Sequence, residues 1–429
     1  MTTPAKSTGL DDYSSAFDPR FGLERLSHAA LARLGREYML FGHIRDRGLM
    51  PPIAARFGVR ATERISILEW MGASPIYTQR MCRAMRIEGD DVATILKSLQ
   101  LDVGFPHRYM DVGYEVESER VGFFWLNCCG ALLDVEPYGE KAVVSMCHAI
   151  EDPTFDATAY ATNPRARVRP VHRPPRSPAD RVPHCRWKIS IDPANEPVPE
   201  PAITRKVRAG RLADFELDPP DLPEDDGRRD YSGPFDPAFQ LDHLSRRALV
   251  VACKEFLLQS QLLARSSMLA LREDYGEETA RELLTTQWLA LAPLSTRRLC
   301  QALAIEGDGV ASILKALQLH PVFPADYLRM GFELVDAARG NFWLEECTAL
   351  GDDEPRGFLS LLDDPACPGL NAMVQAINPR ARCRLLGAPG SSRPRWEVIV
   401  DAQAEPAPEP AEARFVALST VSRFQLEVS

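Results

Sequence analysis

A cysteine and a histidine stand side by side in the first half of the chain, just before two carboxyl groups. The segment MCHAIEDPTFDATA, residues 146–159, contains Cys147, His148, Glu151 and Asp152. Thiol and imidazole groups are the usual ligands of zinc, which prefers four of them in a tetrahedral array. A thiol beside an imidazole is also a potential nucleophile, because the base increases its thiolate fraction. The segment therefore allows two chemistries, metal binding and nucleophilic catalysis.

The metal interpretation needs ligands from other parts of the chain, because no CxxC pair occurs. Cys128 or Cys129 on one predicted strand and Cys185 at the start of another are the candidates. They reach Cys147 and His148 only if the helix that carries these two packs over the sheet. In this interpretation the metal ligands are Cys128, Cys147, His148 and Cys185, and the cofactor is zinc.

The nucleophile interpretation needs an attacking thiol, a base, and an acid that orients the base. The thiol is Cys147 or Cys185. The candidates for the other two roles are the imidazoles of His148, His172 and His184 and the carboxylates of Glu151 and Asp152. The catalytic set on which we settle is Cys147, His148, Asp152 and Cys185. The alternative without chemistry is a set of independent buried thiols and surface histidines, because free cysteine is often buried.

Arginines gather in the segment RVRPVHRPPRSPADRVPHCRW, residues 167–187, which its prolines keep extended. Guanidinium groups bind carboxylates in a bidentate manner, which favours a small acidic substrate. His172, Arg173 and Arg176 have no counterpart in the second half of the chain, and with His43 they are the substrate-binding candidates. A solvated loop that pairs with acidic residues elsewhere is the alternative.

The chain repeats itself internally. FDPRF at residue 17 returns as FDPAF at 235, and IEGDDVATILKSLQL at 87 returns as IEGDGVASILKALQL at 305. FFWLNCCGALLDVEP at 123 returns as NFWLEECTALGDDEP at 341 with the same offset. We expect a flexible N-terminus at 1–11, a first repeat at 12–218, an acidic Pro-rich linker at 219–229, and a second repeat at 230–429.

Comparison of the two copies separates folding residues from chemical ones. Side chains that both copies keep, such as Cys129 with Cys347, are assigned to the core, because diverged domains need the same core but need not share a site. The second copy has other residue types at the positions of the first copy's candidates. Cys128 aligns with Glu346, Cys147 with Leu359 or an apolar neighbour, His148 with Ser360, Cys185 with Pro394, and His43 with Gln261. We expect a site in the first repeat and a degenerate, structural second repeat.

The periodicity of each repeat changes along its length. Residues 23–101 have the spacing of successive helices. From residue 109 the pattern alternates, which predicts a hairpin turning near Glu119 and two further strands at RARVRPV and HCRWKISID. A helix is predicted between them, starting near Gly139. Helices followed by a mostly antiparallel sheet make an α+β fold, and the duplication favours a pseudo-twofold arrangement.

Composition restricts the partners. The formal net charge of −10 repels phosphate backbones and anionic lipids, so neither nucleic acid nor a membrane is an expected partner. The N-terminus lacks the apolar core of a signal peptide, and the chain has 10 cysteines, which we expect to be reduced thiols in the cytoplasm. The duplication predicts an internal pseudo-dimer and leaves the oligomeric state open.

The order of a helical bundle, a hairpin carrying a cysteine, MCHAIED, and a strand HCRWKISI resembles the L-2-amino-thiazoline-4-carboxylate hydrolase family. More distantly, it resembles the small-molecule-binding domains named after 4-vinyl reductase. The resemblance covers both repeats through short motifs. It implies that Cys128 or Cys129, Cys147 with Asp152, and Cys185 hold the places of three cysteines in those hydrolases.

Relatives of the vinyl reductase type hold zinc with comparable cysteines and a glutamate. This chain departs from them just ahead of Cys185, where RPPRSPADRVPH lacks the usual acidic residue and extra cysteine. The tandem duplication is a second departure, and it implies an intramolecular version of the dimers that such domains form.

Two functions follow from these observations. The first is a hydrolase acting on a carbon–nitrogen or carbon–sulfur bond of a small acidic substrate, with Cys147 or Cys185 as nucleophile or metal ligand and Arg173 binding the carboxylate. The alternative is a non-catalytic module that binds a small apolar or aromatic molecule, with zinc as a structural clamp. A third interpretation makes the protein an assembly partner.

Overall fold

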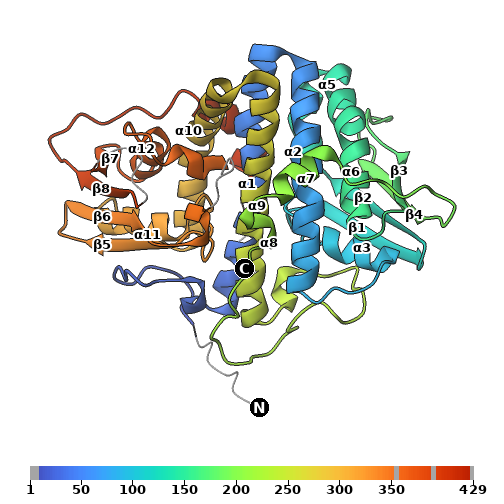
Figure 1. Ribbon diagram of the computed structural model, residues 1–429, viewed down its shortest axis with the longest axis horizontal. Coiled ribbons are helices and arrows are strands. Elements are labelled where there is room, and N and C mark those ends of the chain that lie inside the picture. The colour runs from blue at the N-terminus through green and yellow to red at the C-terminus, as the bar shows by residue number, and fades with distance from the viewer. Residues whose placement is uncertain (1–8, 352–356, 388–392, 426–429) are drawn as a thin grey trace.

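The computed structural model describes residues 9–351, 357–387 and 393–425 of the chain. Helices followed by a four-stranded antiparallel sheet occur twice along the chain (Figure 1). The expected α+β class is therefore confirmed.

Three helices open the first half: α1 (His28–Phe57), α2 (Val59–Ala84) and α3 (Val92–Leu99), after a short η1 (Leu23–Arg25). The Ser27 hydroxyl caps α1 by accepting a hydrogen bond from its first turn. Gly58 ends α1 with a φ of 85°, a conformation that glycine adopts without strain, and the chain turns there into α2. Asp91 caps α3 by accepting from the Thr94 amide at 2.8 Å. The helices predicted between residues 23 and 101 are therefore present.

The first sheet has the strand order β1-β2-β4-β3. Its strands are β1 (Asp111–Ser118), β2 (Val121–Cys128), β3 (Ala166–His172) and β4 (Cys185–Ile191). The hairpin of β1 and β2 turns at Glu119 as predicted, and both further strands are found. Cys185, Trp187 and Ile189 alternate along β4 and are buried on one face of the sheet.

Short helices connect β2 to β3: α4 (Gly130–Val135), η2 (Glu136–Tyr138), α5 (Glu140–Val144), η3 (Ser145–Ile150) and α6 (Glu151–Tyr160). Gly139 precedes α5, where a helix start was predicted. Phe155 of α6 contacts Trp187 of β4 and Phe124 of β2, with ring centroids 4.7 and 5.3 Å apart. The connecting helix therefore packs over the sheet. After β4, α7 (Ala202–Arg208) and α8 (Arg211–Asp214) return to α2.

The second half repeats this order. Its helices are η4 (Leu241–His243), α9 (Arg246–Tyr275), α10 (Glu277–Ala302), α11 (Val310–Leu319), η5 (Thr348–Gly351), η6 (Gly357–Leu361), α12 (Pro368–Gln375), α13 (Ala413–Ala417) and α14 (Thr420–Arg423). Its sheet has the order β5-β6-β8-β7, formed by β5 (Met330–Leu334), β6 (Arg339–Leu344), β7 (Ala381–Leu386) and β8 (Arg395–Val400).

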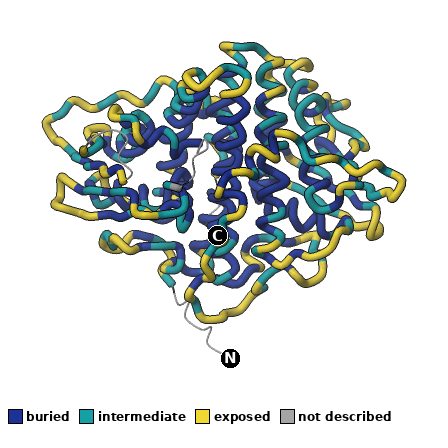
Figure 2. The backbone as a smooth tube through the Cα atoms, in the orientation of Figure 1, coloured by how far each residue is buried: buried dark blue, intermediate teal, exposed yellow. Residues whose placement is uncertain are grey.

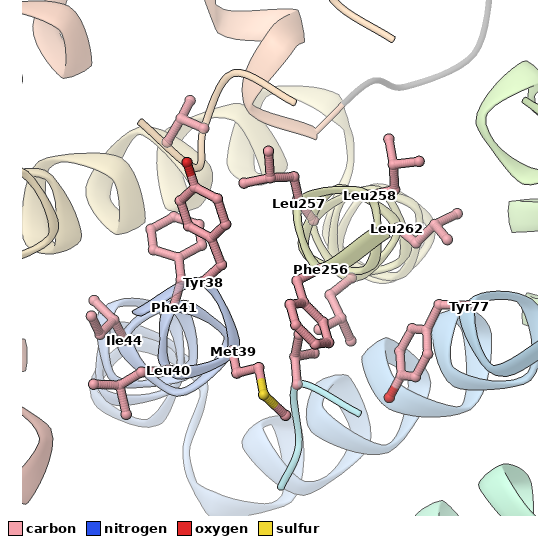
Figure 3. Close-up of a cluster of buried hydrophobic side chains, with 14 of the residues drawn as sticks. Tyr38, Met39, Leu40, Phe41, Ile44, Tyr77, Phe256, Leu257, Leu258 and Leu262 are labelled. Carbon is pink, nitrogen blue, oxygen red and sulfur yellow. The ribbon is translucent and has the colours of Figure 1, made fainter. Parts of the chain in front are cut away.

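The four long helices lie together at the centre, with one sheet on either side (Figure 1). Helix α2 packs against α9 and α1 packs against α10, so each half contacts the other along its longest helices. Figure 2 shows long stretches of buried backbone along the central helices. Tyr38 and Phe41 of α1, Tyr77 of α2, and Phe256 and Leu262 of α9 are buried there (Figure 3). Removal of this apolar surface from water stabilises the contact between the halves.

The segment ahead of each half contacts the other half in a corresponding way. The Tyr13 amide donates to the Leu303 carbonyl at 2.7 Å, and the Tyr231 amide donates to the Met85 carbonyl at 2.8 Å. Leu10 pairs with Leu26, and Arg228 pairs with Leu244. Residues 9–11 of the expected flexible N-terminus therefore include a backbone pairing, while residues 1–8 lie outside the described residues.

Two ion pairs at corresponding positions join the halves, one buried and one partly buried. Arg80 of α2 binds the Glu255 carboxylate of α9 through Nε and Nη2, at 3.1 and 2.9 Å. Arg298 of α10 binds the Glu37 carboxylate of α1 through the same two atoms, at 2.8 and 2.9 Å. Arg80 corresponds to Arg298 in the repeat, and Glu37 corresponds to Glu255. The arginine of each half therefore binds the glutamate of the other half.

Within the described ranges, no helix has both the length and the apolar character needed to cross a membrane.

Candidate functional site

Cys147 lies in η3, a single turn of π-helix between α5 and α6. Such turns are rare in proteins and are frequent at functional sites. The turn packs against α2, and the Cys147 side chain is buried. The local geometry therefore sets Cys147 apart from an ordinary helical cysteine.

Cys129 and Cys185 reach the same region from the sheet. Cys129 follows β2 and caps α4, because its Sγ accepts from the Leu132 amide at 3.4 Å. Its own amide donates to Nδ1 of His184 at 3.2 Å, which ties it to the residue before Cys185. Cys185 pairs with Leu126 of β2. Both thiols are buried between the sheet and the helices.

Cys129, Cys147, Cys185 and Glu151 are close enough for their charges to act on one another, and we name these four residues the thiol cluster. Cys147 interacts electrostatically with all three of the others. They come from the end of β2, from η3, from β4 and from the start of α6. Residues separated widely in sequence thus converge beneath the helix that covers the sheet.

Burial controls the protonation of the thiol cluster. It raises the pKa of Cys185 to about 12 and raises the pKa values of Cys129 and Cys147 well above the usual thiol range. It also raises the pKa of Glu151 to about 8, and the neighbouring Asp152 carboxylate adds to the shift. All four groups therefore carry protons at neutral pH when no cation is bound.

The first expected metal ligand, Cys128, lies outside this cluster. Its side chain is exposed, and its charged neighbours are Asp111 and Arg176. The sequence comparison assigned Cys129 to the core because both repeats keep it. The structure places Cys129, and not Cys128, with Cys147 and Cys185.

The histidines make backbone contacts. His148 contacts the Pro174 carbonyl through Nε2 at 2.7 Å, and His172 contacts the Pro183 carbonyl at 3.1 Å. His184 accepts from the Cys129 amide, as described above. Among the described residues, no imidazole is hydrogen-bonded to a thiol of the cluster. The expected thiol and imidazole pair is therefore not assembled in this structure.

One of the substrate-binding candidates, Arg173, lies near the cluster. Arg173 donates to the Asp152 carboxylate and stands over the Trp187 ring at 5.9 Å, and its charge also acts on Cys147. These guanidinium and carboxylate groups are partly exposed, at 21% and 45%. Arg176 instead forms a two-atom ion pair with Glu136, at 2.8 and 2.7 Å. Arg173 is thus the basic group nearest to Cys147 in this set.

His43 is buried in α1, apart from the thiol cluster. Its Nε2 contacts the Gly104 carbonyl at 3.1 Å, and its ring lies 5.4 Å from that of Tyr109. Burial lowers the pKa of His43 to about 3, so the ring is neutral. Nearby, Arg47 binds Asp134, which also accepts from the Thr420 amide of the second half. The expected contribution of His43 to the same site as Cys147 is not seen.

The thiol cluster supplies a donor set that suits zinc, three thiols and a carboxyl group. Among the described residues, however, no group of three or more His, Cys, Asp or Glu side chains is already arranged around a common point as a metal site. Binding would therefore require the thiols to lose their protons and to close on the ion.

The corresponding places in the second repeat hold apolar groups. Cys147 aligns with Leu359 or an apolar neighbour such as Leu362, both of which are buried, and Pro394, which aligns with Cys185, is also buried. Of the three cluster cysteines, Cys129 alone has a cysteine at the corresponding position, Cys347. A hollow of about 560 Å³ lies elsewhere, between α8 and Thr348, and no residue of the cluster lines it. The convergence of thiols is therefore a property of the first repeat.

Glu151 is the residue whose role the sequence argument assigned differently. The sequence predicts for Glu151, as for Asp152, only the orientation of a histidine. Its spacing of four from Cys147 was the available signal, because such residues share a helical face.

Comparisons with family models, with curated proteins and with solved structures found no match to this chain.

Proposed function

We propose that the first repeat is a zinc-binding module in which Cys129, Cys147, Cys185 and Glu151 are the ligands. The observation that carries the proposal is their convergence from four separate elements into one buried cluster. Ionisation of any one of these four groups makes ionisation of the others more costly. A cation reverses this cost.

The donor chemistry fits zinc, since thiolate and carboxylate are both common zinc ligands. When bound, zinc supplies a positive charge that offsets the negative charge of the ionised ligands. The chain's own residues position the donors: the bond from the Cys129 amide to His184 holds the thiol that follows β2, and the pairing of Cys185 with Leu126 holds the thiol at the start of β4. Burial raises the pKa of Cys147, and the charge of Arg173 acts in the opposite direction, toward the thiolate.

The function that this arrangement supports best is the binding of a small molecule, with the metal as a clamp between sheet and helices. The raised thiol pKa values and the histidine contacts, which place no base at a thiol, favour a metal clamp over catalysis by a thiol. A free thiol nucleophile is disfavoured by both observations.

Hydrolysis of a small acidic substrate is the second candidate, and the Asp152–Arg173 pair favours it. This pair is partly exposed beside Cys147, so a substrate carboxylate could take the place of Asp152 on the guanidinium. Water would then add across a carbon–nitrogen or carbon–sulfur bond. With the thiazoline carboxylate of the resembling family as substrate, Arg173→Gln should raise KM far more than Arg176→Gln, and equal effects would count against this role.

We also propose a pseudo-twofold arrangement of two repeats, 12–218 and 230–429, joined by a linker at 219–229, with the second repeat structural. The exchanged contacts support it: Arg80 with Glu255 corresponds to Arg298 with Glu37, and each N-terminal segment pairs with the opposite half. The proposal extends to a cytoplasmic protein with a small-molecule ligand and with neither nucleic acid nor membrane as a partner.

A zinc titration tests the proposed ligands. The reduced protein competes with a chromophoric chelator, and Cys147→Ala is compared with Cys347→Ala, a matched change in the second repeat. We expect stoichiometric binding by the wild type and by Cys347→Ala, and loss of at least tenfold in affinity in Cys147→Ala. Equal affinity in the two variants would exclude Cys147 as a ligand.

A further inference from the structure

The second repeat contains a pair of neighbouring thiols that the proposed zinc module does not use. Cys367 directly precedes α12, and Cys383 lies on β7. Both side chains are buried, at 2% and 4% exposure. Their partner positions in the first repeat are Asp152 and Val168, so the pair occurs in the second repeat alone.

Asn371 links the two cysteines through the backbone. Its amide donates to the Cys367 carbonyl at 2.8 Å, one turn earlier in α12. Its side-chain Oδ1 accepts from the Cys383 amide, also at 2.8 Å. These bonds hold the start of α12 against β7, and the two thiol groups interact directly, with Cys383 as the hydrogen-bond donor.

The two sulfurs differ in character. The bond from Cys383 lowers the pKa of Cys367, and the Leu385 amide acts in the same direction, against the effect of burial. Burial raises the pKa of Cys383 well above its usual value. An acidic thiol beside a second thiol is the arrangement in which oxidation ends in a disulfide, because the second sulfur is in place to displace the first product.

We propose that Cys367 and Cys383 are a modification site, a dithiol that a peroxide converts reversibly to a disulfide joining α12 to β7. The Cys367 thiolate attacks a peroxide oxygen, so that an S–O bond forms, the O–O bond breaks, and an alcohol or water leaves with a proton. The Cys383 sulfur then attacks the Cys367 sulfenic acid, so that the S–S bond forms and the oxygen leaves as water. Two thiols are oxidised and one peroxide is reduced.

The experiment treats the full chain with hydrogen peroxide, blocks remaining thiols under denaturing conditions, and maps tryptic peptides. The expected product is the peptide 357–380 joined to the dipeptide 383–384, which reductant separates again. Two variants test the assignment. Cys383→Val introduces the residue of the first repeat and should keep the fold, and Cys367→Ser removes the other sulfur.

We expect the cross-linked peptide in the wild type and its loss in both variants. The oxidised wild type should also melt at a higher temperature than the reduced protein, with no such shift in Cys383→Val. Oxidation confined to Cys128 or to the thiol cluster, with Cys367 and Cys383 still open to the blocking reagent, would overturn the proposal. The zinc module would be unaffected by that result, because its ligands belong to the first repeat.

Discussion

The ion pair of Arg80 and Glu255 joins the two halves, and removal of one partner should strongly destabilise the fold. The guanidinium also donates from Nη1 to the carbonyls of Leu212 and Ala213, at 3.2 and 3.3 Å. The two charged side chains are only 2% and 4% exposed. Breaking a pair buried to this degree costs about 3–5 kcal/mol, because the remaining charge keeps its desolvation cost and loses its partner.

The two single substitutions should differ in cost. After Arg80→Met the remaining Glu255 is able to take up a proton, and burial already raises the pKa of this carboxyl group. After Glu255→Leu the remaining guanidinium stays charged. We therefore expect Arg80→Met near the lower end of about 3–5 kcal/mol and Glu255→Leu near the upper end. The double variant should lie within about 1 kcal/mol of the wild type, since neither charge remains.

Urea unfolding followed by circular dichroism measures these differences through the midpoint and slope of the transition. The matched control is the pair of Arg298 and Glu37, whose side chains are 9% and 11% exposed. Glu37→Leu should cost less than Glu255→Leu, because its partner lies closer to water. A cost under about 1 kcal/mol for Glu255→Leu, or a double variant as unstable as the sum of the singles, would refute this reasoning.

Three further outcomes concern the thiol cluster. Because the folded protein raises the pKa of Glu151 from 4.5 to about 8, it binds that proton more tightly than the unfolded chain, and the free energy of unfolding should fall as pH rises through this window. Glu151→Gln should remove this fall in denaturant titrations of metal-free protein, and an unchanged slope would contradict the shift. Zinc affinity should rise with pH, since the thiols must release protons, and a flat profile in the chelator competition would argue against thiolate ligands. Cys128 should be the first thiol labelled by a maleimide in the native protein, because it is exposed, and earlier labelling of Cys147 in peptide maps would contradict its burial.

Much of the fold was predictable because its signals are local. The hairpin at Glu119 and the helix after Gly139 follow from alternation and from a turn residue. The ion pairs that Arg80 and Arg298 each form with a glutamate of the opposite half were not predictable. Each partner lies on a helix far away in the sequence, and the many charged residues of the chain offer many alternative pairings.

The preference for Cys128 over Cys129 came from the comparison of the two repeats, and the periodicity of the strand agrees with it. Phe124 and Leu126 are buried on β2, so strict alternation would also turn Cys128 inward. The pairing of β1 and β2 shifts register at that end, next to Asp111, and the chain then leaves the sheet for α4. An irregularity of this kind redirects side chains, so Cys128 points outward and Cys129 inward.

The catalytic set expected from the sequence includes Asp152, whereas the thiol cluster includes Glu151. The four-residue spacing of Glu151 from Cys147 did not decide between the two acids, because Asp152 follows directly and the number of residues per turn depends on the π-helical turn η3. The amino-acid pattern of SMCHAI carries no signal for that turn. The structure was needed to place Glu151 with the thiols and Asp152 with Arg173.

Elemental analysis of protein purified under reducing conditions tests the central claim most directly, with Cys147→Ala and Cys347→Ala prepared in parallel. The account predicts about one zinc ion per chain in the wild type and in Cys347→Ala, and little or none in Cys147→Ala. A wild type that takes up no zinc even when supplied with it, or equal zinc in the two variants, would contradict the assignment of the thiol cluster as a metal site.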